Sequence, residues 1–279
     1  MKKQHSLKRR LLLLSGVAAI MCTSCIFIPP KEEVEVLKKD GMTCVWQDEF
    51  KYTGVPDTSK WKYQTGHGEG GWGNNELQNY IDNTTEAKTA FVNGEYLTIK
   101  AYKEGNEWKS ARMNSKQSWK YGYIEARLKV TNRVGAWPAF WMMPQDSDYG
   151  RWPASGEIDI MENAPATFGQ NVVFSTLHAN GHYSTAGQGI GKKSYSNLSS
   201  AWHTFGIKWT EEKITAYYDD VSVGEYVNNG SGYNDWPYDK NFFIILNLAI
   251  GGDLGGNASQ VNGLGCNAEF LVDYVRVYQ

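Results

Sequence analysis

Apolar and polar residues alternate with a period of two in segment after segment of this chain. The pattern covers residues 123–130, 204–209, 214–218 and 271–278. Successive side chains of an extended strand point to opposite faces, so each segment predicts a strand with one buried and one solvated face. Residues 242–250 are apolar almost throughout, which predicts a strand covered on both faces.

Helical patterns are scarce by comparison. No window carries a sustained apolar stripe of three-to-four-residue period with caps at both ends. Asp219-Asp220, which separates two of the predicted strands, indicates a tight hairpin turn. Many strands, glycine-rich turns and almost no helix predict an all-β fold. The number of strands favours a β-jelly-roll sandwich of two curved antiparallel sheets.

The first residues have the pattern of an export signal. Five cations stand within residues 2–10, and an apolar run of ten residues, 11–20, follows them. A bilayer crossing needs about 20 apolar residues, so the segment predicts a cleaved signal peptide. Its end, Cys22-Thr23-Ser24-Cys25, resembles a bacterial lipoprotein cleavage site, with residues 1–24 as the signal and Cys25 as the lipidated residue. An ordinary cleaved signal without a lipid is the alternative.

Lipidation of Cys25 implies an outer-membrane lipoprotein whose only membrane attachment is the N-terminal lipid. Residues 25–40 contain Pro29-Pro30 and a charged stretch, which predicts a tether. Lys31-Glu32-Glu33 within it resembles a surface-export signal, so we expect exposure at the cell surface rather than in the periplasm. Loss of the signal leaves 23 cationic against 30 acidic residues and changes the net charge from −2 to −7. This charge disfavours nucleic acid as a partner.

Residues 41–279 show no linker, repeat or low-complexity tract, which predicts one domain. We expect this domain to be a monomer. It contains two cysteines, Cys44 near its start and Cys266 near its end. An oxidising compartment permits a bridge between them, and a pair of free buried thiols is the alternative.

Three acidic residues stand close together in residues 156–163. Glu157 and Asp159 are two apart, so they point to the same face of a strand. Strict alternation would send Glu162 to the apolar face, where an unpaired carboxylate is costly. A β-bulge near Ile160-Met161 would return Glu162 to the face of the other two acids. The alternative is an edge strand with ordinary surface charges.

Two carboxyl groups on one face suit the cleavage of a glycosidic bond. The reaction needs one group that attacks the sugar or activates water and another that protonates the leaving oxygen. If Glu157 and Glu162 lean together, their carboxyl groups stand about 5–6 Å apart, which suits a covalent intermediate and net retention. Asp159 between them would share a proton with Glu157.

The acid segment and further motifs resemble glycoside hydrolase family 16. The spacing Glu-x-Asp-x-x-Glu matches the longer, bulged signature of the laminarinase-like branch. The other motifs are residues 46–50, 73–78, 123–127, 136–142 and 273–278. The resemblance implies a concanavalin A-like jelly roll in which residues 41–279 are the catalytic domain. It also implies Glu157 as the nucleophile, Glu162 as the general acid/base and Asp159 as the assisting acid.

Side chains around the acids are candidates for holding a sugar. Trp137 and Trp141 are four apart and share one face of a strand, and Trp152 directly precedes the acid segment. Aromatic rings stack on the apolar faces of sugars. The resemblance implies that His178 orients a carboxylate or a sugar and that Asn75 and Arg112 bind sugar hydroxyls. A packed core residue is the alternative for each tryptophan and for His178.

The chemistry requires no cofactor, and the five histidines and four cysteines show no ligand spacing for catalytic zinc. The resemblance implies a structural calcium on the face away from the cleft. Its ligands would include Glu49, Gly94 and Asp273, some of them through backbone carbonyls. Oxygen ligands suit calcium.

Together these features predict a secreted, endo-acting, retaining β-glucanase whose partner is a β-glucan polysaccharide. Mixed-linkage β-1,3-1,4-glucan and β-1,3-glucan such as laminarin both stay open as substrates. A non-catalytic, lectin-like glycan-binding module is an alternative, because one architecture can host both functions. A glucan transglycosylase using the same nucleophile is another.

Overall fold

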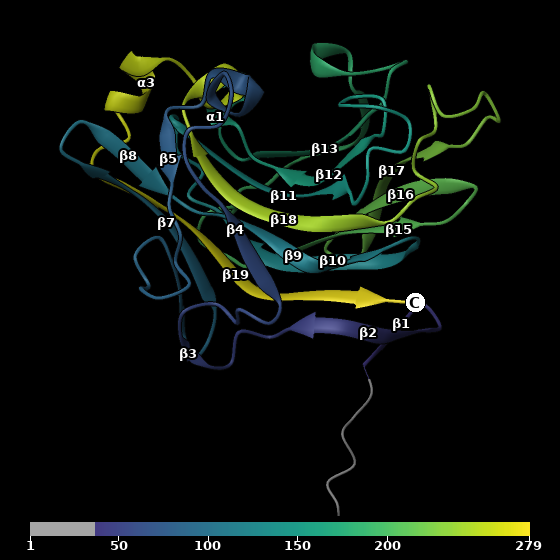
Figure 1. The fold of residues 1–279 in the computed structure, drawn as a ribbon, viewed down its shortest axis with the longest axis horizontal. Helices are drawn as coiled ribbons and strands as arrows, with labels where there is room; N and C mark the ends of the chain where they lie inside the picture. Colours follow the sequence, from purple (N-terminus) through teal and green to yellow (C-terminus); the bar gives the residue numbers. More distant parts are fainter. Residues whose placement is uncertain (1–36) are drawn as a thin grey trace, which may run out of the picture. The chain divides into compact units, whose positions relative to one another are not determined.

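Two β-sheets make up most of the part of the chain that the structure describes. The structure is a computed structural model and describes residues 37–279. The predicted signal peptide, the lipidation residue Cys25 and most of the predicted tether lie outside the described residues. Figure 1 shows the sheets as curved layers, one over the other. The predicted all-β jelly-roll sandwich of two antiparallel sheets is confirmed.

The larger sheet has twelve strands, eight of which form one continuous path. In spatial order the path contains β17 (Val221–Val227), β16 (Lys213–Tyr218), β15 (His203–Trp209), β10 (Gly122–Lys129), β19 (Asn267–Tyr278), β7 (Leu97–Glu104), β6 (Ala90–Asn93) and β3 (Thr53–Gly54). Beside it lie β1 (Lys38–Lys39), β2 (Met42–Asp48), β5 (Gln78–Tyr80) and β8 (Glu107–Ser110). The β5–β8 pair is parallel.

The smaller sheet has seven strands and carries the predicted acids. Its spatial order is β14 (Gln188–Ser194), β13 (Val172–His178), β12 (Glu157–Glu162), β11 (Ala136–Pro144), β18 (Phe242–Ile250), β9 (Arg112–Trp119) and β4 (Trp61–Gln64). The helical segments are η1 (Gly71–Asn75), α1 (Pro165–Phe168), η2 (Ser184–Ala186), α2 (Gly252–Gly255) and α3 (Ala258–Asn262). Within residues 37–279, none of the helices is long and apolar enough to cross a bilayer.

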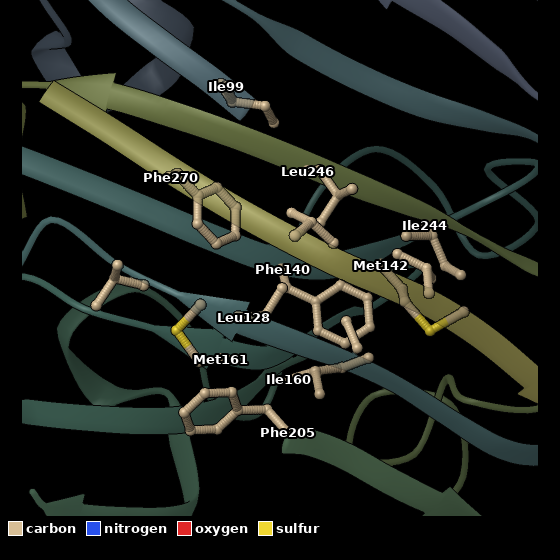
Figure 2. Packing of buried hydrophobic residues seen from close by; sticks show 14 of the residues in the cluster. Ile99, Leu128, Phe140, Met142, Ile160, Met161, Phe205, Ile244, Leu246 and Phe270 are labelled. Carbon is tan, nitrogen blue, oxygen red and sulfur yellow. The ribbon is translucent and has the colours of Figure 1, made fainter. Parts of the chain in front are cut away.

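The alternation in the sequence accounts for the core between the sheets. In β10, every second side chain, Ile124, Ala126 and Leu128, is fully buried. The predicted solvated face is wrong for the first half of this strand, because Tyr123 and Glu125 are also buried. Strand β18 is buried along nearly its whole length, as the apolar run predicts. Figure 2 shows side chains from both sheets meeting in this core, with Phe140 of β11 close to residues of β12 and β18. Burial of this apolar surface is the main force that holds the layers together.

The predicted hairpin at Asp219-Asp220 joins β16 to β17. Both residues have positive φ, 51° and 62°, as the tight turns between antiparallel strands require. The Asp219 carboxylate fixes the turn, because it accepts hydrogen bonds from the Thr204 amide and lies 2.9 Å from His203 Nδ1.

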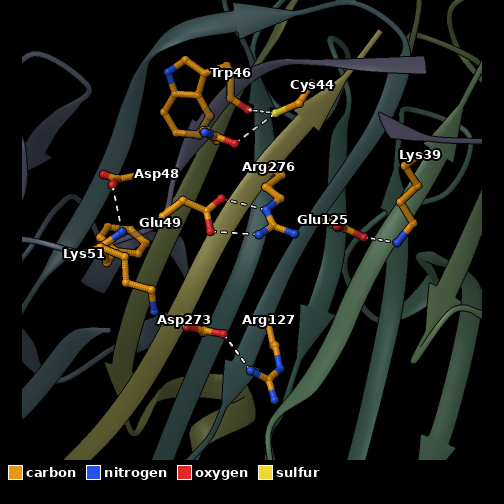
Figure 3. Close-up of polar contacts among 12 residues, drawn as sticks. Lys39, Cys44, Trp46, Asp48, Glu49, Lys51, Glu125, Arg127, Asp273 and Arg276 are labelled. Atoms are coloured by element: carbon orange, nitrogen blue, oxygen red, sulfur yellow. Dashed lines mark hydrogen bonds and ion pairs between the residues drawn. The ribbon is translucent and has the colours of Figure 1, made fainter. Parts of the chain in front are cut away.

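The boundary between tether and domain differs from the prediction. Residues 38–40 fall in the predicted tether, yet Lys38–Lys39 forms β1, which pairs with β2. The Lys39 ammonium contacts the carboxylate of Glu125 (Figure 3). It also contacts the carboxylate of Asp220 at 2.7 Å. Since Glu125 is only 2% exposed, its charge needs this partner, and the sequence pattern of the tether could not reveal it.

The two cysteines of the domain are free thiols. Cys44 is half-buried and its thiol donates to the carbonyl oxygen of Trp46, whereas Cys266 is exposed. The bridged alternative therefore does not describe this structure. The alternative of two buried thiols also fails at Cys266.

Candidate active site

Strand β12 contains the bulge that the acid spacing predicts. Two consecutive residues of β11 pair with Met161 and Asp159, so Ile160 is the extra residue of β12. The register with β13 shifts over the same stretch. Ile160 and Met161 both lie in the core, although they are adjacent in sequence. The next residue, Glu162, consequently returns to the face that carries Glu157 and Asp159.

Each of the three acids has a different neighbour. Trp152 Nε1 donates a hydrogen bond to Glu157 Oε2, and Trp137 Nε1 donates to Glu162 Oε1 at 2.8 Å. Asp159 Oδ2 lies 3.1 Å from Nε2 of His178. One oxygen of Glu157 and one of Glu162 thus each accept a hydrogen bond from an indole group.

Burial raises the pKa of all three acids, and the charge of a neighbouring acid raises it further for Glu157 and Glu162. Burial, followed by the charge of Asp159, raises the pKa of Glu157 to about 8. Burial raises the pKa of Asp159 to about 7. Burial and then the charge of Asp159 raise the pKa of Glu162 well above its usual range, and the charge of Glu157 adds to this. Near neutral pH the cluster therefore holds at least one proton.

His178 lies opposite Glu157 in the β12–β13 register and contacts Asp159. The resemblance implies that this histidine orients a carboxylate or a sugar, and the carboxylate that it contacts is that of the middle acid. Gly187 makes room for the ring, because a Cβ at that position would lie 2.6 Å from the Cε1 atom of His178. We therefore assign His178 the task of orienting Asp159.

Glu157, Asp159 and His178 also have the ligand types of a metal site. One donor atom from each lies within 4.8 Å of the other two. Asp159 already hydrogen-bonds with Glu157 and contacts Nε2 of the histidine, so the middle acid has a partner on each side. Nδ1 of His178 is buried without a hydrogen-bond partner. The cluster fits a proton-sharing site, and no chemical step below uses a metal.

Arg112 lies between two tryptophan rings on the same sheet face. Its guanidinium carbon is 4.6 Å from the ring centre of Trp72 and 4.7 Å from that of Trp141. Its Nε donates to Gln64 Oε1 at 2.6 Å, and the residue is only 8% exposed. A desolvated cation between two indoles contributes about 2 kcal/mol or more for a favourable pair, so Arg112 fixes both rings.

A chain of hydrogen bonds supports Trp141 from below. Its Nε1 donates to Asn247 Oδ1 at 2.7 Å, and the amide of Asn247 donates to the Tyr80 hydroxyl at 2.9 Å. That hydroxyl donates to Glu76 at 3.1 Å. Burial raises the pKa of Glu76, and the nearby charge of Arg112 opposes this shift. The network fixes the position of Trp141 against the acid strand.

The sequence patterns did not predict the residues that support Trp141 and Arg112, namely Glu76, Tyr80, Asn247 and Trp72. Glu76 belongs to a motif that carries the family resemblance, but nothing in its spacing indicates burial. Tyr80 and Asn247 are 167 positions apart and come together only through strand pairing. Trp72 has an unusual backbone, with φ of 58°, in the loop that brings it to Arg112.

The remaining predicted sugar-binding residues differ in exposure. Trp152 is 47% exposed and Asn75 is also exposed, so both are accessible to a ligand. Trp137 is 8% exposed and offers little more than an edge. Asn75 donates to Asp253 at 2.8 Å beside a pocket of about 370 Å³ between η1, α1 and α3. The structure thus brings the tryptophans, Arg112 and His178 to the acid strand, with Asn75 farther along.

Two of the residues predicted to bind calcium, Glu49 and Asp273, lie among cationic side chains (Figure 3). Asp273 bonds to Lys51 at 2.9 Å and to Arg127 at 2.7 Å, and Glu49 forms two hydrogen bonds with Arg276. Lys51 also donates to the backbone carbonyl oxygen of Glu95, the residue after Gly94. The negative charge that would attract a divalent cation is already neutralised, so this arrangement does not fit calcium. Calcium binding stays a prediction from resemblance, and no step depends on it.

Comparisons with known proteins agree on one family. The family model described as Glycosyl hydrolases family 16 matches residues 76–266. A beta-glucanase from Rhodothermus marinus is 39% identical over 249 residues, covering 84% of each chain. The laminarinase structure from Rhodothermus marinus has a TM-score of 0.76 at 36% identity, over 85% of this chain and 96% of that one. SCLam, a non-specific endo-beta-1,3(4)-glucanase, has a TM-score of 0.78 at 32% identity, over 88% and 94%.

The raised pKa of Glu157 predicts a pH-dependent stability difference. The unfolded chain ionises this carboxyl near pH 4.5, whereas the folded chain holds the proton to about pH 8. Folding is therefore increasingly disfavoured as pH rises through this window, and Glu157→Gln removes that cost. Thermal unfolding should show a higher Tm for Glu157→Gln than for the parent at pH 8.5, by about 2–4 °C per kcal/mol recovered. At pH 4.5 the two should agree.

The exposed residue Glu69 offers the matched control. Glu69→Gln should leave Tm unchanged at both pH values, because an exposed carboxyl has no burial cost to recover. Equal Tm values for Glu157→Gln and the parent across the whole pH range would contradict the assigned burial.

Proposed function

The chain belongs to glycosyl hydrolase family 16, and from this premise we propose that it is an endo-acting β-glucanase. Its proposed substrates are β-1,3-glucan, mixed-linkage β-1,3-1,4-glucan or both, since relatives named for each of these activities resemble it. The observation that carries the proposal is the bulge of β12, which turns Glu157 and Glu162 to one face. Family membership alone would not identify the reacting groups.

In the proposed first step, a Glu157 carboxylate oxygen attacks the anomeric carbon as the glycosidic C–O bond breaks. Glu162 gives its proton to the leaving oxygen, and a covalent glycosyl ester forms on Glu157. Water then attacks the same carbon and Glu162 takes its proton, so both carboxyl groups return to their starting states. The two inversions give net retention.

The electrostatics favour this division of roles. Glu162 has the pKa that is raised well above its usual range, so it is the group that enters the reaction protonated. The charge of Glu157 helps to raise that pKa. When Glu157 becomes an ester its charge disappears, the pKa of Glu162 falls, and Glu162 becomes a better carboxylate base for the second step.

Asp159 would hold the proton that Glu157 gives up before it attacks. The two carboxyl groups share a hydrogen bond, and their pKa values are about 7 and about 8. Such a close pair titrates as a unit, so a small change on sugar binding can move the proton from one to the other. His178, at 3.1 Å from Asp159, fixes the orientation of that carboxyl.

The sugar-binding roles follow the exposure of each side chain. We propose that the exposed ring of Trp152 and the amide of Asn75 contact glucose units directly. Trp141 would offer a ring fixed by Arg112, and Trp137 would mainly hold Glu162. Aromatic faces and a few fixed polar groups are what a glucan chain requires of a cleft.

The alternative of a non-catalytic glycan-binding module is less favoured. A binding protein gains nothing from three closely spaced carboxyl groups, two of them buried, because burial and mutual repulsion destabilise the fold. Transglycosylation uses the same glycosyl ester and differs only in the acceptor that attacks it. Products larger than the starting oligosaccharide would identify that reaction.

We also propose that the protein is exported and attached to the outer membrane by a lipid on Cys25, with its domain at the cell surface. The support is the cationic and apolar leader with its Cys22-Thr23-Ser24-Cys25 end. A polymer-cutting enzyme at that location meets its substrate without transporting it. The domain would act as a monomer, with no nucleic-acid partner.

Activity assays on lichenan, laminarin, xyloglucan and agarose test the reaction. Glu157→Gln and Glu162→Gln should each lower kcat by about 10²–10⁴-fold or more on the preferred β-glucan, because each removes a group that acts in the transition state. Glu69→Gln should retain full activity, and early products should be large. Turnover within a few-fold of the parent in Glu157→Gln would overturn the assignment.

Palmitate labelling of the expressed full chain tests the anchor. The parent should incorporate label and Cys25→Ala should not, because only the Cys25 thiol would accept the lipid. Cys22→Ala serves as the control and should still be labelled. Equal labelling of the parent and Cys25→Ala would remove Cys25 from the account.

A further inference from the structure

We propose that a second pocket, separate from the acid cluster, binds another segment of the β-glucan chain. The pocket has a volume of about 360 Å³. Four aromatic side chains and two carboxylates contribute to its lining: Tyr121, Tyr149, Tyr233, Trp236, Glu211 and Asp239. No role in the proposed reaction has been given to any of them.

The pocket is formed by turns and loops at one end of the sandwich. Its residues come from the β9–β10 and β15–β16 turns, the β11–β12 loop and the segment before β18. Pro237 and Tyr238 pack against Gly156, directly before β12, where an added Cβ would be 2.9 Å from Pro237. The hydroxyl of Tyr238 in the same segment donates to the carbonyl oxygen of His178 at 2.9 Å. This segment separates the pocket from the acids.

A stacked pair of tyrosines provides a flat surface for a sugar ring. Tyr149 and Tyr233 have ring centres 4.7 Å apart and planes only 4° from parallel. The ammonium of Lys240 lies 5.2 Å from the ring centre of Tyr149. Tyr233 is 48% exposed and is the accessible member of the pair. An accessible ring with a fixed orientation is the feature on which the apolar face of a pyranose stacks.

The polar groups of the pocket suit a neutral polymer with many hydroxyls. Asp239 is held in place, because the Tyr149 hydroxyl lies 2.9 and 2.8 Å from its two carboxylate oxygens. Glu211 is exposed at the rim. Carboxylates accept hydrogen bonds from sugar hydroxyls, whereas they repel sulfated or phosphorylated chains. Two ammonium groups lie beside the pocket, that of Lys240 near Tyr149 and that of Lys120 near Tyr121. The charges of Asp148 and Glu212 also act on groups of the pocket, so acids outnumber these ammonium groups.

The loop that carries Tyr233 is already ordered by its own hydrogen bonds. Asp235 accepts from the Tyr226 hydroxyl at 2.7 Å and from the Asn229 amide at 2.9 Å. Trp236 stacks on Tyr226 with ring centres 5.8 Å apart. Binding of a ligand here would therefore cost little conformational entropy of the loop.

This proposal rests on the proposed β-glucanase function and adds a second contact with the polymer. A long chain bound at the pocket stays close to the enzyme, so its bonds reach the cleft at a higher effective concentration. A short oligosaccharide that only fills the cleft gains nothing from the pocket. The pocket should therefore affect polymer hydrolysis and leave short substrates unaffected.

Tyr233→Ala tests the pocket in two ways. On laminarin or lichenan it should raise KM about three- to tenfold, the range expected for one aromatic contact, while kcat/KM on a short β-glucan oligosaccharide stays unchanged. In the inactive Glu157→Gln background, affinity electrophoresis through the same polymer should show less retardation when Tyr233→Ala is added. This second measurement needs no catalysis, so it separates failure of the pocket from failure of the proposed reaction.

Two variants serve as controls. Tyr233→Phe keeps the ring and should behave like the parent. Tyr96→Ala removes a tyrosine ring that packs near Trp202, outside the pocket, and should also leave retardation and KM unchanged. Equal retardation of Glu157→Gln with and without Tyr233→Ala would overturn the proposal. An equal loss on polymer and short oligosaccharide would also overturn it, because the residue would then belong to the cleft.

Discussion

One extra residue in β12 determines what this face of the protein can do. Without Ile160 as a bulge, strict alternation would put Glu162 into the core opposite Glu157. With it, Ile160 and Met161 both fill the interior and the three acids share one face. The apolar contacts of Ile160 and Met161 stabilise the strand. They therefore offset the cost of holding three carboxyl groups close together.

The residues around the three acids hold each carboxyl group in a different environment. Indole groups of Trp137 and Trp152 each donate to one oxygen of a proposed catalytic glutamate, and His178 contacts the middle acid. Different neighbours give the acids different proton affinities, which is how two similar carboxyl groups could take the opposite roles proposed for them. On the opposite sheet, Lys51, Arg127 and Arg276 neutralise the acids that the family resemblance assigned to calcium. Lysine and arginine side chains thus balance the acids on one sheet, whereas raised pKa values reduce the charge of the acids on the other.

Sequence reasoning was sufficient where a short-range rule applied. Period-two alternation located the principal strands, the spacing of Glu157 and Glu162 located the bulge, and paired aspartates located the hairpin. It failed where partners lie far apart in the chain. The buried network from Trp141 to Glu76 and the pairing of Lys39 with Glu125 depend on strand order, which local patterns do not encode.

The anomeric configuration of the first product tests the central claim most directly. Proton NMR of early hydrolysis of the preferred β-glucan follows the new reducing end before mutarotation exchanges its two forms. If Glu157 attacks and Glu162 serves as acid and then base, the first signal is that of the β-anomer. Initial formation of the α-anomer would show a single displacement by water, and the proposed roles of the two glutamates would be wrong.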